Sequence, residues 1–197
     1  MSEGARWWLW LTAVLMGGTV LAWWLPAGWL DWQPDLAMTE PWRAWSAAFV
    51  HWSPLHLGAN LLAAAVVGAY GLAAQVPRAQ AVAWFAAWPL TQLGLLAKPD
   101  LAHYGGLSGV LHGGVAIVCL WLLVVARGGR RAVGAAVALG LLIKLVSEGP
   151  WGPALQRSDD FDIALAPIAH ATGALAGLLC GLLALAVTRS WAPRSVP

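Results

Sequence analysis

Long apolar stretches separated by short polar ones run through this sequence from end to end. A helix that crosses a bilayer needs about 20 predominantly apolar residues. Six stretches approach that length: 7–25, 55–74, 79–97, 108–126, 132–147 and 168–188. We take the first as a helix that stays in the protein, because no small-x-small cleavage site follows it. The pattern predicts an all-α membrane protein, a bundle of six spanning helices.

The distribution of positive charge predicts the orientation of this bundle. Cytoplasmic loops of membrane proteins carry an excess of Lys and Arg. With the N-terminus inside, the inner side collects Arg6, Arg78, Arg127, Arg130, Arg131, Arg189 and Arg194. The outer side then collects Arg43, Lys98 and Arg157, with Lys144 near it. We therefore expect both termini in the cytoplasm.

Composition supports a membrane protein and excludes several other classes. The chain has 197 residues, of which 60% are hydrophobic and 10% charged, whereas a soluble domain carries roughly a quarter charged residues. Because the deficit extends along the whole sequence, we expect a single transmembrane domain over 1–197. Cys119 and Cys180 lie inside apolar stretches and form no metal-ligand spacing. We see no motif for a cofactor, a nucleotide or nucleic acid.

Two long connections are predicted on the outer side. Residues Pro26–Pro54 are rich in Trp and Pro, and we expect them to form short pieces in the interface. Residues Gly149–Pro167 would lie over the outer helix ends, where a loop of this length is a candidate gate. Most of the 15 tryptophans stand near predicted helix ends, so we expect interfacial anchors there, Trp8 and Trp32 among them.

Residues able to do chemistry stand at the outer ends of three predicted helices. Ser108 and His112 are four residues apart and so share one face of their helix. His56 and Asn60 do the same on the second helix. His170 shares a face with small residues, and small residues at this spacing let two helix backbones approach closely. The residues that could meet are Gly109, Gly113, Gly173, Gly177 and Gly181. We expect this contact to bring His170 to Ser108.

Such a meeting would supply the groups that acyl transfer requires. A serine hydroxyl becomes a good nucleophile when a base within hydrogen-bond reach takes its proton. His170 is the candidate base, and we find no acid placed to orient it, so we expect a Ser–His dyad. His56, the Asn60 amide and the Ser108 backbone N–H are candidate donors to the oxyanion. Each such donor is typically worth roughly 3 kcal/mol of barrier.

Other interpretations of these residues stay open. Ser108 alone could bond back to its own helix, and His56 and Asn60 could be structural links between helices. The five histidines of the chain could instead form a metal site, although no HExxH-type helix accompanies them. The separate residues are better explained together, as one catalytic site at one depth.

Four motifs in this order resemble the rhomboid family of intramembrane serine proteases. They are the Trp42-Arg43 pair, His51-x4-His56-x3-Asn60, Gly106-Leu107-Ser108-Gly109 and Ala169-His170-x2-Gly173-x3-Gly177. The resemblance implies cleavage of a substrate's transmembrane segment near its outer end. It implies Ser108 as nucleophile, His170 as base and an oxyanion hole lined by His56 and Asn60, with His51 and Arg43 structural.

One position departs from the common family pattern. Many rhomboids carry a tyrosine one turn after the serine, stacked on the catalytic histidine, where this chain has His112. His112 could pack on His170, tune its basicity or contact substrate. The stretch Gly106–Gly113 is similar to the rhombosortase branch, which implies substrates with a C-terminal Gly-Gly sorting helix and the bacterial inner membrane. A catalytically silent relative that binds membrane helices is the alternative.

Overall fold

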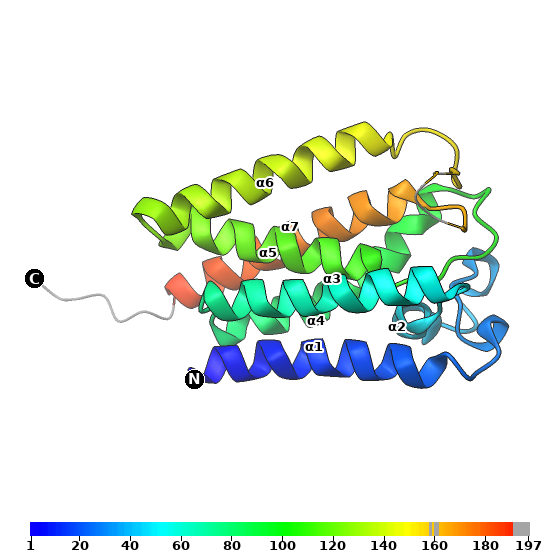
Figure 1. Cartoon of the computed structure of the whole chain (residues 1–197), viewed down its shortest axis with the longest axis horizontal. Coiled ribbons are helices and arrows are strands. Elements are labelled where there is room, and N and C mark those ends of the chain that lie inside the picture. Colours follow the sequence, from blue (N-terminus) through cyan, green and yellow to red (C-terminus); the bar gives the residue numbers. More distant parts are fainter. Residues whose placement is uncertain (158, 160–161, 191–197) are drawn as a thin grey trace, which may run out of the picture.

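The structure, a computed structural model, describes residues 1–157, 159 and 162–190, and this part of the chain is helical (Figure 1). The long helices are α1 (Glu3–Ala22), α3 (Pro54–Ala73), α4 (Arg78–Leu93), α5 (Ser108–Val125), α6 (Gly128–Glu148) and α7 (Pro167–Ser190). The short ones are η1 (Ala27–Trp29), η2 (Pro34–Leu36), α2 (Arg43–Ser46), η3 (Ala47–Phe49) and η4 (Gly94–Ala97). Each of the six predicted apolar stretches therefore forms a helix.

The helix ends differ from the apolar runs by a few residues. Helix α1 begins at Glu3 because the side chain of Ser2 accepts a hydrogen bond from the N–H of Ala5, at 3.3 Å, and caps the helix. It ends at Ala22, with Trp23 as its C-cap, inside the apolar run that was predicted to continue to Leu25. Helices α1 and α6 thus both start in polar sequence that a search for apolar runs leaves out.

Three of the described helices are apolar and long enough to cross a membrane. They are α3, α5 and residues Pro167–Thr188 of α7. Helix α4 is only 16 residues long, and α6 carries Arg130, Arg131, Lys144 and Glu148. Membrane insertion is therefore supported by three helices, and the count of six spans stays a prediction.

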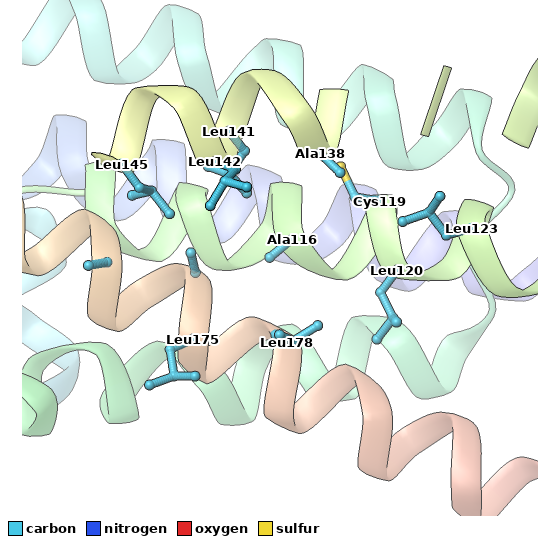
Figure 2. Close-up of a pocket in the computed structure, with 12 residues that line it drawn as sticks. Ala116, Cys119, Leu120, Leu123, Ala138, Leu141, Leu142, Leu145, Leu175 and Leu178 are labelled. Atoms are coloured by element: carbon cyan, nitrogen blue, oxygen red, sulfur yellow. The ribbon is translucent and has the colours of Figure 1, made fainter. Parts of the chain in front are cut away.

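Helix α5 lies inside the bundle, and α6 lies at its edge (Figure 1). Most residues of α5 are buried, whereas Gly134 is the one residue of α6 that is buried. A cavity of about 310 Å³ separates part of α6 from α7, with α5 as its floor, and Leu141, Leu142 and Leu175 line it (Figure 2). Helix α5, which begins with Ser108, is thus packed on most sides. Helix α6 is the least buried of the helices that contact it.

Glycines bring α5 and α7 into backbone contact. A Cβ on Gly173 would lie 1.9 Å from the carbonyl oxygen of Gly109, and one on Gly177 would lie 2.3 Å from that of Gly113. Both distances are far below van der Waals contact, so no larger residue fits without moving a helix. The predicted close approach of these two helices is confirmed, and it sets the depth of His170 relative to Ser108.

The expectation of interfacial tryptophans was wrong for Trp8 and Trp32, whose exposed fractions are both 0%. Trp8 stacks on Trp84 with ring centroids 4.3 Å apart and donates its indole N–H to the carbonyl of Val67, at 3.1 Å. Trp32 forms an isolated β-bridge with Tyr104. Trp8 enters the core because Val67 accepts its N–H and Gly71 leaves room for its ring, whereas the buried N–H of Trp32 has no partner among the described residues.

An ionic cluster organises the first long connection, which forms short helical pieces as expected. Arg43 donates to the carbonyl and carboxylate of Asp31, at 2.8 and 3.1 Å, and to the carboxylate of Glu40, at 2.5 Å. His103, which precedes α5, contacts the other oxygen of Asp31 at 2.6 Å. Arg43 and Asp31 are buried, so this cluster ties the first connection to the loop before Ser108.

The second long connection is tied to α3 and η4. Ser53 donates to the carboxylate of Asp162 at 2.6 Å, and Lys98 donates to the carbonyls of Trp151 and Gly152 at 3.2 and 2.6 Å. Residues 158, 160 and 161 of the candidate gate lie outside the described residues.

The basic residues of the short loops gather at the end of the bundle opposite Ser108. Arg78 contacts Glu3 and lies over the ring of Trp7, and Arg130 donates to the carbonyl of Ala74 at 2.9 Å. Arg194 lies outside the described residues.

Candidate active site

Ser108 is the first residue of α5 and meets His170 from the first turn of α7. The distance from the Ser108 Oγ to the Nε2 of His170 is 2.9 Å. Residues 62 positions apart are therefore within hydrogen-bond reach, at the end of a helix pair that the glycine contacts hold together. His170 is 6% exposed, which shields the pair from bulk solvent.

A carboxylate contacts the other nitrogen of the His170 ring. The Nδ1 of His170 lies 2.7 Å from the carboxylate oxygen of Glu148, the last residue of α6. The expectation that no acid is placed to orient His170 was wrong. It arose because the predicted fifth helix ended at residue 147, which left Glu148 in the outer loop.

An ionised carboxylate in this place favours one of the two tautomers of the His170 ring. An ionised carboxylate can only accept hydrogen bonds, so Nδ1 donates to Glu148 and the lone pair of Nε2 faces the Ser108 hydroxyl. That tautomer can take a proton from Ser108, as a general base must.

His112 stacks on His170. The ring centroids are 4.2 Å apart and the planes are inclined by 12°. The Nδ1 of His112 lies 2.7 Å from the carbonyl oxygen of Ser108, one turn earlier, and this bond holds the ring in place. Of the three interpretations of His112, the structure places it in the first, packed on His170.

His56 and Asn60 lie on one buried face of α3. Ser53 caps this helix by accepting from the His56 N–H at 3.0 Å, and Asn60 donates to the His56 carbonyl at 3.0 Å. The ring of His56 lies next to Gly106, two residues before Ser108, since a Cβ on that glycine would be 3.1 Å from the ring. Its Nδ1 is buried without a hydrogen-bond partner among the described residues.

Gly106 gives the loop before Ser108 its shape. Its φ of +141° is one that L side chains rarely adopt, and a Cβ there would lie 3.1 Å from the His56 ring. Its N–H donates to the carbonyl of Ala47 at 3.0 Å, and its carbonyl accepts from the Tyr104 hydroxyl at 3.3 Å. Burial raises the pKa of Tyr104 to about 12, so this hydroxyl stays a donor at neutral pH. The glycine therefore lets α3 approach the nucleophile.

His51 supports His56 from the side. Their ring centroids are 4.5 Å apart, and the Nδ1 of His51 donates to the carbonyl of Phe49 at 3.2 Å. Burial lowers the pKa of His51 to about 4, which the Phe49 contact opposes, so the ring is neutral at pH 7. This position suits the structural role expected for His51.

The histidines do not assemble into a metal-binding group. Within residues 1–157, 159 and 162–190, no three His, Cys, Asp or Glu side chains are grouped so that they could hold a metal ion. His103 instead belongs to the cluster around Arg43 and Asp31. The alternative of a histidine metal site therefore gains no support from the described residues.

Comparison with known sequences identifies the family of this chain. The Rhomboid domain matches residues 38–187, well over half of the chain. The chain belongs to the rhomboid family. The matched range spans all of the candidate site residues, from His56 and Asn60 on α3 to His170 on α7. No individually curated protein matches the chain.

Membership of the rhomboid family makes this an integral membrane protein of a family of intramembrane serine proteases, whose members act on membrane-protein substrates. The resemblance found in the sequence is thereby confirmed at the level of the family. Two residues of the candidate site, Glu148 and Tyr104, were not identified from the sequence. A carboxylate on the last turn of an apolar helix was the available signal for Glu148, and nothing in the sequence singled out Tyr104.

Proposed function

We propose that this rhomboid is an active intramembrane serine endopeptidase that cleaves single-span membrane proteins. The observation that carries the proposal is the 2.9 Å contact between the Ser108 hydroxyl and the Nε2 of His170, in the tautomer that can accept the serine proton. A silent relative would not need a nucleophile and a base held in this geometry.

The reaction follows from these groups. Ser108 Oγ attacks the carbonyl carbon of the scissile bond, and its proton passes to His170 Nε2. The tetrahedral intermediate collapses as the C–N bond breaks, and His170 returns the proton to the leaving amine. Water then attacks the acyl-enzyme, with His170 again taking and returning a proton, and this step frees the acid product and Ser108.

The oxyanion would be stabilised by donors at the start of α5 and on α3. The first N–H groups of a helix have no acceptor within the helix, and those of α5 begin at Ser108. The His56 ring lies next to Gly106 and its buried Nδ1 has no partner among the described residues, and the Asn60 amide carries a second N–H besides the one given to the His56 carbonyl. Removing a donor of this kind typically slows turnover about 10²- to 10³-fold.

A groove beside the site suits a substrate helix. A cavity of about 630 Å³ lies between α3, α5 and α6, and its walls are apolar apart from His112 and Lys144, which it contains at one end. Its apolar lining residues include Ala59, Leu62, Val66, Leu111, Val115 and Leu141. His112 also stacks on His170, so a transmembrane segment in this groove would end next to Ser108.

The orientation proposed for the protein places this site toward the outer face. Six spans with both termini in the cytoplasm would put the basic end of the bundle, with Arg78 and Arg130, inside. Ser108 and His170, at the opposite helix ends, would then lie below the outer leaflet. The same orientation suits the inner membrane of a bacterium.

The narrower proposal concerns the substrate. The stretch Gly106–Gly113 is similar to the rhombosortase branch, so we propose proteins with a C-terminal Gly-Gly sorting helix as substrates. Comparing the membrane proteins shed by cells with wild-type or Ser108→Ala protein tests this. A Gly-Gly helix shared by the proteins that differ supports it, and shed proteins without that feature contradict it.

Labelling by a fluorophosphonate probe separates an active enzyme from a silent relative. We expect the purified wild-type protein to be modified at Ser108, and expect labelling to be lost in His170→Asn. Equal labelling of the two proteins, or none of the wild type, would contradict the proposal.

A further inference from the structure

Glu148 contacts His170, as Ser108 and His112 also do. Its position at the end of a helix is one that the helix itself does not favour. It is the last residue of α6, followed by Gly149 in the left-handed conformation with φ +59°. The C-terminal end of a helix carries partial negative charge, so a carboxylate there is unfavourable and a Lys or Arg would be favoured. A helix that ends in Glu against this preference needs another partner for the carboxylate.

Two partners supply that compensation. One carboxylate oxygen of Glu148 contacts the Nζ of Lys144, one turn earlier, and the other lies 2.7 Å from the Nδ1 of His170. The order Lys then Glu along a helix is the weaker arrangement of such a pair, so helix stability alone does not explain it. The Glu148 side chain is 20% exposed, and Lys144 is 49% exposed. Glu148 thus faces the histidine while Lys144 holds it from the solvent side.

Helix α6 contributes little else that would require this contact. Gly134 is its one buried residue, and cavities lie on both of its sides, one toward α7 (Figure 2) and one toward α3. A carboxylate that merely fastened α6 to α7 could bond any donor on α7. It bonds the ring nitrogen whose protonation decides whether Nε2 can act as a base.

We infer that Glu148 is the positioning residue for His170, so that the catalytic unit is Ser108, His170 and Glu148 with Lys144 as its outer support. This inference rests on the proposed function. Glu148 accepts the Nδ1 hydrogen, which keeps Nε2 unprotonated before the attack. It then stabilises the imidazolium formed when His170 takes the serine proton. Glu148 itself stays ionised throughout, and no proton moves to it.

The test compares Glu148→Gln, Glu148→Asp and Ser147→Ala in a reconstituted cleavage assay with a single-span substrate. Gln keeps the size of the side chain but can present an N–H to Nδ1, which favours the wrong tautomer. In a serine protease with a Ser-His-Asp triad, replacing the acid by its amide lowers kcat about 10⁴-fold. We expect Glu148→Gln to lower kcat by about 10²- to 10⁴-fold and to leave KM within about threefold.

The other two variants separate positioning from structure. Glu148→Asp restores a carboxylate, and we expect its kcat to exceed that of Glu148→Gln by at least about tenfold. Ser147→Ala removes an exposed polar group from the same last turn of α6, and we expect wild-type kcat and KM. Each rate is divided by the amount of monodisperse folded protein, so a loss of folding does not count as a loss of kcat.

Two results would overturn the inference: a Glu148→Gln kcat within threefold of wild type, or Asp and Gln variants that are equally slow. Ser108→Ala distinguishes this failure from failure of the proposed function. If Ser108→Ala is inactive while Glu148→Gln keeps its kcat, the protease stands and Glu148 has no positioning role. If Ser108→Ala cleaves like wild type, the proposed function fails as well.

Discussion

His112 lies almost parallel to His170, with the two ring centroids 4.2 Å apart. A stacked aromatic pair is worth about 0.5–1.5 kcal/mol beyond the area it buries, which corresponds to roughly a 2- to 12-fold change in rate. We expect His112→Ala to lower kcat by about this factor, because His170 loses the surface that holds its ring. The measurement is steady-state cleavage of a reconstituted single-span substrate.

The matched control for this prediction is His112→Phe, which keeps a ring and removes both nitrogens. It should retain most of the wild-type kcat. If Phe and Ala are equally slow, the bond from the His112 Nδ1 to the Ser108 carbonyl is the important contact, and the stacking account is contradicted.

Gly173 is the position at which α5 and α7 approach most closely, since a Cβ would lie 1.9 Å from the Gly109 carbonyl oxygen. We expect Gly173→Ala to separate the helices and to cost about 1–3 kcal/mol of stability, the usual cost of overpacking. The Ser108–His170 contact would lengthen, so kcat should fall as well. Equilibrium unfolding in mixed micelles and the cleavage assay measure the two effects.

Gly17→Ala in α1 is the matched control, because nothing lies within 4 Å of the Cβ it adds. Alanine is the better helix former by about 0.5–1 kcal/mol, so this variant should be as stable as wild type or slightly more stable. Equal destabilisation by both substitutions would show that the glycine contact does not hold α5 and α7 together.

The lowered pKa of His51 predicts that the folded protein loses stability in mild acid. Its folded pKa of about 4 lies below the ordinary value of 6.5, so between these values the unfolded chain binds more protons than the folded one. Stability from this residue is present above pH 6.5 and is lost as pH falls toward 4. Between pH 7 and pH 5 the loss is about 2 kcal/mol. Unfolding free energies at the two pH values measure it.

The comparison protein for this test is His51→Gln, which cannot titrate in this range. It should lose about 2 kcal/mol less than wild type between pH 7 and pH 5. Parallel losses in the two proteins would contradict the assignment of the effect to His51.

Replacement of the buried Arg43 is expected to have a large effect on stability. It is buried against Asp31, and removing one partner of a buried pair leaves an uncompensated charge at a cost of about 3–5 kcal/mol. We expect Arg43→Ala to lower the unfolding free energy by about this amount and Arg157→Ala, at an exposed arginine, to change it by less than about 0.5 kcal/mol. Similar small effects in both variants would show that the cluster does not hold the first connection.

The long helices and the contact between the last helix and α5 were predictable from the sequence. Apolar runs gave all six long helices, and the spacing of Gly173 and Gly177 indicated which face of the last helix meets α5. Both predictions depend on a pattern within one helix, either the length of an apolar run or the spacing of small residues, and the sequence shows such patterns directly. The helix ends were less accurate, since the polar Ser2 caps the start of α1 and the helix stops at Ala22, inside the apolar run.

Features that depend on the relative position of separate helices were harder to predict. Glu148 lies 22 residues before His170 and on another helix, so no spacing rule connects them. The burial of Trp8 depends on the space that Gly71 leaves on α3. In each case the deciding contact is made by a neighbour that only the packing of the bundle brings close.

Cleavage of a single-span reporter in proteoliposomes tests the central claim most directly. With purified protein at neutral pH, the account predicts that wild type cuts the reporter near one end of its transmembrane segment. It also predicts that Ser108→Ala, folded to the same extent, produces no cut product. Cleavage by Ser108→Ala at the wild-type rate would contradict the account.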